Sequence, residues 1–430
     1  MADAGEYTPR DSMYLWWIGT QPRLIAKLAL VTGGRSVAVE YVPSWLESGF
    51  ALSEDLPLLP GLFVPRDKGV AAGAVDDARP DRWGERVIRK FERSPRLSVL
   101  EFLLFAGDDR YGCLGVSLRG DAYEPWATAP MPTLASLQEM AEVVRKVLAN
   151  EPVPELQRRL IHPGVSLGGA RPKSLLSIDD EPWLVKFTEG EEMNTELVEH
   201  SSMTLAAGCG IHVAHTRALT VGDRHAIAVR RFDRAGSLRV HAISANVALR
   251  AAGEELGYPH LAQLLRRLAP ADAIASQQQE LFRRMVFNIL MDNTDDHEKN
   301  HSLLQQGGGG YLLSPAFDVL PSASGLGVQA MLVGAAAAES SIDNALSQVS
   351  AFGLSLDAAK GVVAEVARQV EGWKEHFRQR GVSDADIDTL AQYIDGDQLR
   401  SQRRAASRDG HAGCLVQETR ARGRAPGPPR

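Results

Sequence analysis

The 430-residue chain has few cysteines, no long apolar run and no secretion signal, and each of these absences excludes a class of protein. Its three cysteines, Cys113, Cys209 and Cys414, are odd in number and far apart, which argues against a disulfide framework and against a cysteine metal site. No apolar run approaches the roughly 20 residues that a membrane-spanning helix needs, and the first residues lack the basic and apolar parts of a secretion signal. We therefore expect a cytoplasmic protein without a membrane-embedded part.

The chain also has little net charge, −7 at pH 7, and this charge is spread unevenly. Residues 401–430 contain seven Arg against one Asp and one Glu and so carry +5, which leaves −12 for the rest of the chain. Residues 1–400 therefore lack the general basic character of a nucleic-acid-binding protein. If DNA is involved, we expect a partner or a local patch to contact it.

The composition is that of an ordinary globular protein, with 44% hydrophobic and 23% charged residues, and the length predicts two or three domains. Short alternating runs over residues 13–42 predict a small antiparallel sheet. The prolines of residues 123–133 are typical of a linker, and an amphipathic helix should follow over 134–150. From residue 244 to 397 the pattern is mostly helical, and the Arg, Gly and Pro content beyond residue 399 indicates a disordered end.

The most informative stretch surrounds Asp295 and Asn300. These residues stand five positions apart, the spacing by which a kinase catalytic loop places a proton-accepting carboxylate and a metal-binding amide on one turn. Two short apolar runs over 302–306 and 311–314, separated by four glycines, predict a hairpin that carries Asp318 back toward Asn300. Amide and carboxylate oxygens suit Mg²⁺, which holds nucleotide phosphates. The order of helix, loop, hairpin and second carboxylate therefore favours a phosphoryl-transfer site.

The same residues allow a second chemistry, because His297, Glu298 and His301 form the H-E-x-x-H pattern of zinc proteases. That pattern needs a helix through both histidines and a third ligand downstream. The metzincin extension would require a histidine where Gly307 stands, so that only Asp318 is left as a third ligand. A zinc hydrolase and a plain polar surface loop both stay as alternatives.

A glycine-rich segment, residues 164–173, precedes two predicted strands over 174–178 and 183–187. Closely spaced glycines let backbone N–H groups converge on phosphate oxygens, and a strand lysine such as Lys186 can neutralise them. No Gly-Lys-Ser/Thr is present, so the segment is not a Walker A motif, and alone it would more often be a plain turn. Because Lys186 and Asp295 are also present, we interpret the glycine-rich segment as a phosphate loop.

A predicted helix over residues 194–207 contains Glu196 and Glu199. Either carboxylate could pair with Lys186, as a kinase helix glutamate does. An exposed position is the plainer expectation for both, and more so for Glu196.

Arg231 ends a predicted strand over residues 225–231, and Phe232 follows it. They stand at the point in the chain where a small kinase lobe should pass into a large one. The order of the elements therefore suggests that the backbone here could hold adenine.

With these motifs in this order, the chain resembles the HipA-type toxin kinases, which are serine/threonine kinases of bacterial toxin–antitoxin modules. The resemblance runs over residues 13–399, and the N-terminal part, with 80–84 and 107–110, is similar to the family's N-terminal domain. The other matching stretches are 166–173, 184–187, 229–234, 293–301 and 313–318.

The resemblance implies an α+β, protein-kinase-like two-lobed fold, with small antiparallel sheets in an N-terminal α/β part and a mainly helical C-terminal lobe. We accordingly expect a HipA-like N-terminal domain over 13–122 and a small kinase lobe over 134–231. A mainly helical catalytic lobe should follow over 232–400, and a disordered basic tail over 401–430.

The family pattern also implies a role for each matching residue. Asp295 would be the catalytic base, and Asn300 and Asp318 would be the Mg²⁺ ligands. Lys186, paired with Glu199, would contact the ATP phosphates. Further nucleotide contacts are expected from Ser166, Leu167, Gly168, Gly169, Ala170, Lys173, Arg231, Phe232, His297 and Lys299.

Regulation and partners are implied in the same way. Ser166 matches a loop serine that family members autophosphorylate, which ejects the loop and switches the kinase off. Studied members phosphorylate aminoacyl-tRNA synthetases, which halts translation, and are neutralised by a HipB-type DNA-binding antitoxin. The resemblance therefore implies ATP and Mg²⁺, a protein substrate, an antitoxin, and DNA contacted through the antitoxin complex.

Two features depart from the pattern. Asp296 stands where a family toxin has glycine, which adds charge beside the base, and the tail beyond Leu399 has no counterpart. A catalytically silent partner of a DNA-binding antitoxin, acting through its surfaces alone, is the non-enzymatic alternative. The presence of the full set of base, lysine and metal-ligand residues argues against it.

Overall fold

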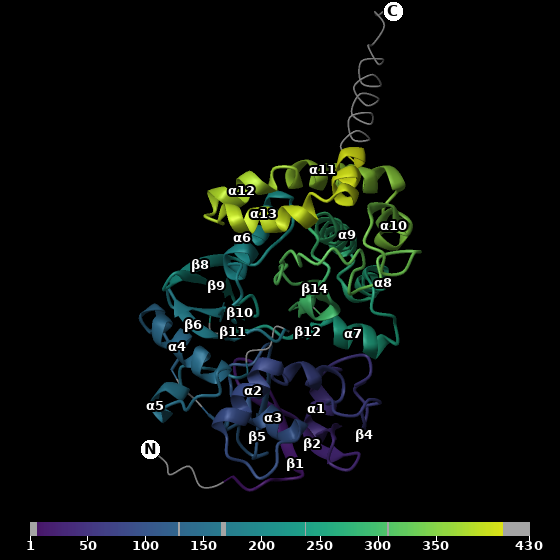
Figure 1. The fold of residues 1–430 in the computed structure, drawn as a ribbon. Helices are drawn as coiled ribbons and strands as arrows, with labels where there is room; N and C mark the ends of the chain where they lie inside the picture. The colour runs from purple at the N-terminus through teal and green to yellow at the C-terminus, as the bar shows by residue number, and fades with distance from the viewer. Residues whose placement is uncertain (1–6, 128–129, 165–168, 237, 308, 407–430) are drawn as a thin grey trace, which may run out of the picture. The chain divides into compact units, whose positions relative to one another are not determined.

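The computed structural model describes residues 7–127, 130–164, 169–236, 238–307 and 309–406 (Figure 1). The chain divides into two compact units whose segments alternate in sequence. The first unit comprises Met1–His200, Ala214–Leu256 and Glu298–Phe317, and the second comprises Ser201–Val213, Gly257–His297 and Asp318–Arg430. The consecutive domains expected from the sequence, over 13–122, 134–231 and 232–400, stay a prediction.

A five-stranded antiparallel sheet forms near the N-terminus, as predicted for residues 13–42. Its strands are β1 (Ser12–Ile18), β2 (Pro22–Val31), β3 (Ser36–Tyr41), β4 (Leu62–Phe63) and β5 (Leu114–Ser117), in the order β4-β3-β2-β1-β5. Met13 and Leu15 of β1 are fully buried, because alternate side chains of a strand point to the same face. The helices of this region are α1 (Pro43–Ser48), η1 (Gly73–Ala78), α2 (Arg82–Phe91) and α3 (Val99–Phe105).

A second antiparallel sheet, in the order β6-β7-β9-β8, contains the strands predicted on either side of Lys186. Its strands are β6 (Lys173–Ile178), β7 (Glu181–Lys186), β8 (Thr216–Val221) and β9 (Arg224–Arg230). Asp179 and Asp180 connect β6 to β7 with positive φ angles of 55° and 61°. Two consecutive positive φ angles are typical of the two-residue turn whose twist matches a hairpin.

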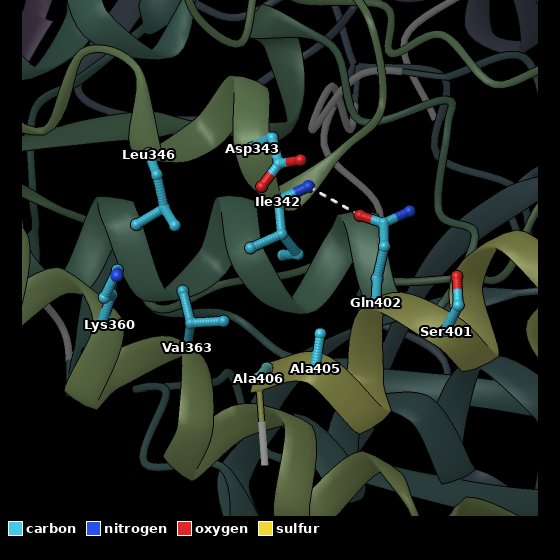
Figure 2. A pocket seen from close by; sticks show the side chains of 9 residues that line it. All are labelled: Ile342, Asp343, Leu346, Lys360, Val363, Ser401, Gln402, Ala405 and Ala406. Atoms are coloured by element: carbon cyan, nitrogen blue, oxygen red, sulfur yellow. Dashed lines mark hydrogen bonds between the residues drawn. The ribbon is translucent and has the colours of Figure 1, made fainter. Parts of the chain in front are cut away.

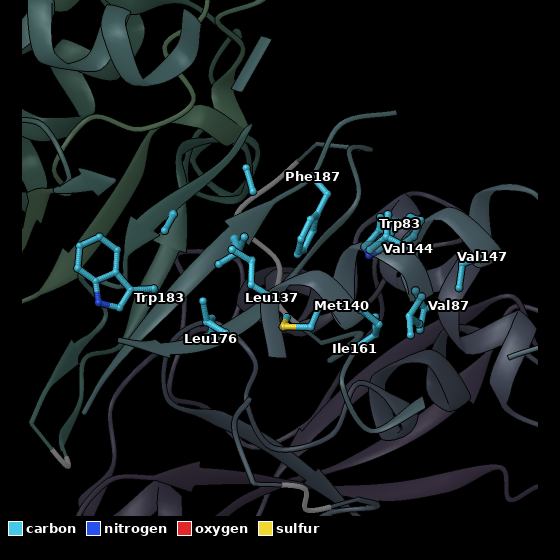
Figure 3. Packing of buried hydrophobic residues seen from close by; sticks show 14 of the residues in the cluster. Trp83, Val87, Leu137, Met140, Val144, Val147, Ile161, Leu176, Trp183 and Phe187 are labelled. Atoms are coloured by element: carbon cyan, nitrogen blue, oxygen red, sulfur yellow. The ribbon is translucent and has the colours of Figure 1, made fainter. Parts of the chain in front are cut away.

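An apolar cluster joins α2 and α4 (Leu137–Leu148) to this second sheet (Figure 3). Trp83 of α2, Met140 of α4 and Leu176 of β6 all belong to it. The buried residues of α4 recur three or four positions apart, which places them on one face of the helix. Removal of these side chains from water is the main force that attaches the helix to the sheet.

The predicted glycine hairpin is present in the first unit. Strands β13 (Ser302–Gln305) and β14 (Tyr311–Leu313) pair antiparallel, and β13 also pairs with β12 (Ala242–Ser244). Ser244 then begins α7 (Ala245–Ala252) by accepting a hydrogen bond from the Val247 N–H. The remaining elements are η2 (Leu134–Ser136), α5 (Glu155–Arg158), α6 (Thr195–Gly208), β10 (Arg234–Ala235), β11 (Leu238–Arg239), α8 (Tyr258–Leu268), α9 (Ile274–Leu290), η3 (Glu298–Asn300), α10 (Ile342–Leu346), η4 (Val349–Phe352), α11 (Leu356–Val370), α12 (Trp373–Gln379) and α13 (Asp384–Ile394).

Two stretches differ from the sequence pattern. Residues 314–341, expected within a mostly helical region, form turns and isolated bridges, since their glycines and alanines carry no helical period. Residues 397–406 form a helix although composition suggested disorder from about residue 400. Arg403 in that helix is buried and donates to the Asp395 carboxylate at 2.6 Å and to the Ile394 carbonyl.

Cys113 and Cys209 are buried and unbridged, in agreement with the expectation of isolated thiols. Burial raises the pKa of both thiols to about 12, which keeps them protonated. Cys414 lies outside the described residues. Over the described part of the chain, no helix combines the length and the apolar character needed to cross a membrane.

Asp233 is the centre of a buried ionic cluster in the first unit. Its carboxylate accepts hydrogen bonds from Arg231 at 2.7 Å, from Arg234 at 2.5 Å and from the backbone N–H of Gly112 at 2.8 Å. Burial by itself raises the pKa of this carboxyl, but the two guanidinium groups hold it at about 2. The cluster connects the loop before β5 to the end of β9.

We expect Asp233→Asn to lower the free energy of unfolding by about 3–5 kcal/mol at pH 7, because two buried guanidinium groups lose their carboxylate. The pKa of Asp233 lies below the ordinary 3.8, so its stabilising contribution is present above about pH 4 and is lost as the pH falls toward 2. Urea titrations of both proteins at pH 7 and at acid pH measure the difference. Asp121→Asn, at an exposed pair with Arg119, is the control and should leave stability unchanged. Equal effects of the two substitutions would contradict the prediction.

Candidate active site

Lys186 and Glu199 form a buried ion pair in the first unit. Lys186 is the last residue of β7, which lies between β6 and β9 in the sheet, and Glu199 belongs to α6. The Lys186 Nζ donates to the Glu199 Oε1 at 2.8 Å, and the two side chains are 7% and 1% exposed. Of the two glutamates that the sequence left open as partners, the structure thus brings Glu199 to the lysine. An interior strand and a helix hold the two ends of the pair, so regular elements fix the position of the ammonium group.

Glu196 is also buried, with 1% of its surface exposed, although an exposed position was expected. It lies one helical turn before Glu199 and therefore shares its inward face. Arg171 approaches Glu196 at 3.4 Å and donates to the Thr195 hydroxyl at 2.9 Å. Burial raises the pKa of Glu196 to about 7, Arg171 opposes the rise, and the charges of Glu191 and Glu199 add to it.

The glycine-rich segment is described only in part. Ser166, Leu167 and Gly168 lie outside the described residues. Gly169 has a positive φ angle of 85°, a conformation that favours glycine, and Ala170 is exposed. The predicted contact of this segment with phosphate stays a prediction.

Lys173, expected among the nucleotide contacts, is the first residue of β6 and is buried. Its ammonium group pairs with the carboxylate of Asp81 at 2.5 Å. Asp81 in turn caps α2 by accepting from the Gly84 N–H at 2.9 Å. In this structure Lys173 therefore links the start of β6 to the N-terminal part of the chain.

The side chains of Arg231 and Phe232 both have structural contacts. Arg231 is buried in the ionic cluster of Asp233, and the Phe232 ring lies 5.4 Å from that of Phe317 and 6.0 Å from that of Tyr111. The Arg231 N–H donates to the Pro182 carbonyl at 3.1 Å. A role of this backbone in holding adenine stays a prediction.

Asp295 is exposed on a short loop that follows α9 in the second unit. The backbone N–H groups of Thr294 and Asp295 both donate to the Ser322 hydroxyl, at 2.9 and 3.2 Å. Asp292 begins the loop with a positive φ angle of 53°, and its carboxylate accepts from the Ser324 N–H at 3.2 Å. Hydrogen bonds from residues 322–324 thus hold the loop on the side that precedes Asp295.

Asp296, the residue next to the candidate base, is 3% exposed. The Tyr258 hydroxyl and the Asn288 amide both donate to its Oδ2, the latter at 2.8 Å, and the Asn293 amide donates to the Asn288 Oδ1 at 3.0 Å. Burial, followed by the charge of Asp296, raises the pKa of Tyr258 well above its ordinary value, so the phenol is a hydrogen-bond donor. The carboxylate that stands in place of glycine is therefore buried among donors.

Asn300 closes the short 3-10 turn η3 in the first unit and is buried, whereas Lys299 beside it is exposed. His297 is half-buried and His301 is buried. Because the turn between the histidines is not an α-helix, the backbone required by the zinc-protease pattern is absent. Within the described residues, no group of three or more His, Cys, Asp or Glu side chains is arranged to hold a metal ion.

Asp318 lies in the second unit, is half-buried and has a positive φ angle of 58°. A non-glycine residue in this region of φ carries backbone strain, which occurs preferentially at functional positions. The side chains of Asn300 and Asp318 offer oxygen ligands of the kind that Mg²⁺ prefers. Their joint coordination of a metal stays a prediction.

A hollow of about 310 Å³ lies in the helical part of the second unit, away from the predicted residues in sequence (Figure 2). Gln402 lines it and accepts a hydrogen bond from the Ile342 N–H at 2.7 Å. The other lining residues are Asp343, Leu346, Lys360, Val363, Ser401, Ala405 and Ala406. None of the residues with an expected role in phosphoryl transfer belongs to this set.

Sequence reasoning missed Tyr258, Asn288 and Ser322, which contact the candidate loop. No fixed spacing connects them to Asp295, and two of them come from other elements of the unit. Asn288 offered one signal, since it is a polar residue on a buried position of α9. Ser322 offered none, because a serine in an irregular segment is ordinary.

The chain is similar to known proteins in sequence and in structure. Residues 165–373 match the family model of the HipA-like C-terminal domain. A chain in the structure of the Shewanella oneidensis MR-1 toxin–antitoxin system HipA, HipB and operator DNA complex matches with 18% identity and a TM-score of 0.64. The match covers 93% of this chain and 99% of that chain. The Helicobacter pylori proinflammatory kinase CtkA matches with 14% identity and a TM-score of 0.44, over 56% of this chain and 93% of that chain.

At 18% identity the HipA match shows a shared fold, and the predicted α+β, kinase-like fold class is confirmed. The family model adds that the shared region includes the glycine-rich segment, Lys186, Asp295, Asn300 and Asp318. Residues 165–373 are therefore similar to the HipA-like C-terminal domain, and the chain shares its fold with a HipA toxin–antitoxin structure.

Proposed function

We propose that the chain is an ATP- and Mg²⁺-dependent protein serine/threonine kinase of the HipA toxin type. The observation that carries the proposal is the buried pair of Lys186 and Glu199. Active kinases use a strand lysine, oriented by a helix glutamate, to bind the ATP phosphates. Lys173 is also buried beside a carboxylate, so burial alone does not distinguish the two lysines; the pairing of a strand lysine with a helix glutamate is what matches the kinase arrangement.

Asp295 is proposed as the catalytic base. Its carboxylate accepts the proton of a substrate Ser or Thr hydroxyl while the hydroxyl oxygen bonds to the γ-phosphorus and the bond to the ADP oxygen breaks. The exposed position of Asp295 leaves it accessible to a protein substrate. The loop hydrogen bonds restrict its backbone, so that little reorganisation is needed at the moment of transfer.

Asn300 and Asp318 are proposed as the Mg²⁺ ligands, because one amide and one carboxylate oxygen fit the preference of that ion. When bound, the ion neutralises charge on the phosphates. Lys186 adds a fixed positive charge from the sheet. His297, Lys299 and the glycine-rich segment are proposed as further nucleotide contacts.

The biological role proposed is that of a growth-inhibiting toxin whose substrate is a translation component such as an aminoacyl-tRNA synthetase. The related Shewanella oneidensis HipA occurs in a complex with HipB and operator DNA. We extend this to a HipB-type antitoxin as partner and to DNA contacted through that complex. Autophosphorylation of Ser166 would make the kinase self-limiting.

We expect Asp295→Asn to abolish label transfer from γ-labelled ATP, with a loss of several orders of magnitude, on the order of 4 kcal/mol or more in barrier. The purified proteins are incubated with Mg²⁺ and the labelled residue is mapped by mass spectrometry. Label on Ser166 in the unmodified chain, and none in the variant, is the expected result. Asp384→Asn, an exposed residue of α13, is the matched control and should behave as the unmodified chain.

Transfer by Asp295→Asn at the unmodified rate would refute the assignment of the base. If the unmodified chain binds ATP without transferring phosphate to itself or to added protein, the better explanation is a catalytically silent protein that acts as the partner of a DNA-binding antitoxin. Absence of ATP binding would have the same meaning.

We expect Glu199→Gln to reduce kcat/KM for ATP by about 10- to 100-fold, because Lys186 loses the charge that orients it. Steady-state kinetics with varied ATP measures the effect, and circular dichroism shows whether the fold is kept. Glu192→Gln is the control, since this exposed glutamate stands just before α6. Kinetics identical to those of the control would contradict the proposed orienting role.

A further inference from the structure

A short irregular segment of the second unit, residues 322–330, pairs with the loop that carries Asp295. The Ser322 N–H donates to the Asp292 carbonyl at 2.8 Å, and the Ala330 N–H donates to the Thr294 carbonyl at 3.0 Å. The hydroxyls of Thr294 and Ser324 lie 3.1 Å apart, within hydrogen-bond distance. The two stretches thus pair along their length without forming a regular strand.

The side chain of Ser322 contributes two of the hydrogen bonds that hold the Asp295 loop. Its hydroxyl oxygen accepts two backbone N–H groups, those of Thr294 at 2.9 Å and of Asp295 at 3.2 Å. A hydroxyl has two acceptor lone pairs, so one serine satisfies both donors. An alanine at this position would leave both N–H groups without that acceptor.

A second group of contacts holds the other side of Asp295. Asp296 is directed into the protein, where Tyr258 and Asn288 donate to its carboxylate. The backbone is therefore restrained at Thr294 and Asp295 by Ser322, and at Asp296 by α8 and α9. Between the two restraints only the side chain of Asp295 is exposed.

The geometry points to Ser322 as a positioning residue for phosphoryl transfer, acting through the backbone of Asp295. This inference rests on the proposed kinase function of Asp295. A catalytic carboxylate must be held within a fraction of an ångström of its productive position, and loss of that precision lowers the rate of the chemical step. Ser322 fixes the backbone from which the carboxylate extends and has no expected role in binding ATP.

The test compares Ser322→Ala, Ser322→Thr and the unmodified chain in steady-state transfer from γ-labelled ATP. Ser322→Ala should lower kcat by about 10- to 100-fold and leave the KM for ATP unchanged, because the restraint acts on the base. Ser322→Thr keeps the hydroxyl and should restore most of the rate. The matched control is Ser383→Ala, which removes a serine hydroxyl that accepts the Asp386 N–H at 3.1 Å at the start of α13. This control should keep the unmodified kcat.

Hydrogen–deuterium exchange over residues 291–297 gives a second readout that does not depend on activity. Faster exchange of this peptide in Ser322→Ala than in the unmodified chain, with the rest of the pattern kept, is expected. An unmodified kcat in Ser322→Ala would overturn the inference, as would unchanged exchange of the peptide. If the unmodified chain transfers no phosphate, the proposed kinase function fails, and exchange alone then decides whether Ser322 holds the loop.

Discussion

The buried ion pair of Lys186 and Glu199 is the contact on which the candidate site depends. Removing either charge from water without the other costs several kcal/mol, so each is stable in this position only beside its partner. Lys186 ends an interior strand and Glu199 belongs to α6, so the same contact also attaches the helix to the sheet. The fold and the position of the proposed phosphate-binding charge therefore have a common cause.

The first unit has further buried polar contacts where the N-terminal residues meet the sheet β6-β7-β9-β8 and the paired strands β12, β13 and β14. Lys173 of β6 pairs with Asp81, and Asp233 after β9 accepts the Gly112 N–H. The Tyr111 hydroxyl donates to the Ser302 hydroxyl of β13 at 3.0 Å. Because these contacts are buried and directional, they fix the N-terminal part to the strands that carry site residues. That part is better regarded as a support of the site than as a separate module.

The sequence alone was sufficient to predict the structure where local patterns determine it. The hairpins β6–β7 and β13–β14 follow from alternating apolar residues around turn residues, and the pairing of Lys186 with a glutamate of α6 follows from residue order in a kinase. The sequence alone was insufficient where contacts between residues far apart in the chain determine burial or backbone path. Glu196 is buried beside Arg171, which comes from a distant part of the sequence, and the irregular segment 322–330 pairs with the Asp295 loop. Ser322 could not be recognised, because its role exists only in that pairing.

The adjacent residues Asp295 and Asp296 show how a backbone gives identical side chains different environments. Asp296 is buried and accepts hydrogen bonds from Tyr258 and Asn288, whereas Asp295 is exposed. Successive side chains leave a non-helical backbone in different directions, so an inward anchor at Asp296 favours an outward direction for its neighbour. A glycine at this position would have no side chain to anchor and would depend on other contacts to restrain the loop. The second carboxylate is thus a structural part of the loop, because its lone pairs are engaged by donors from two helices.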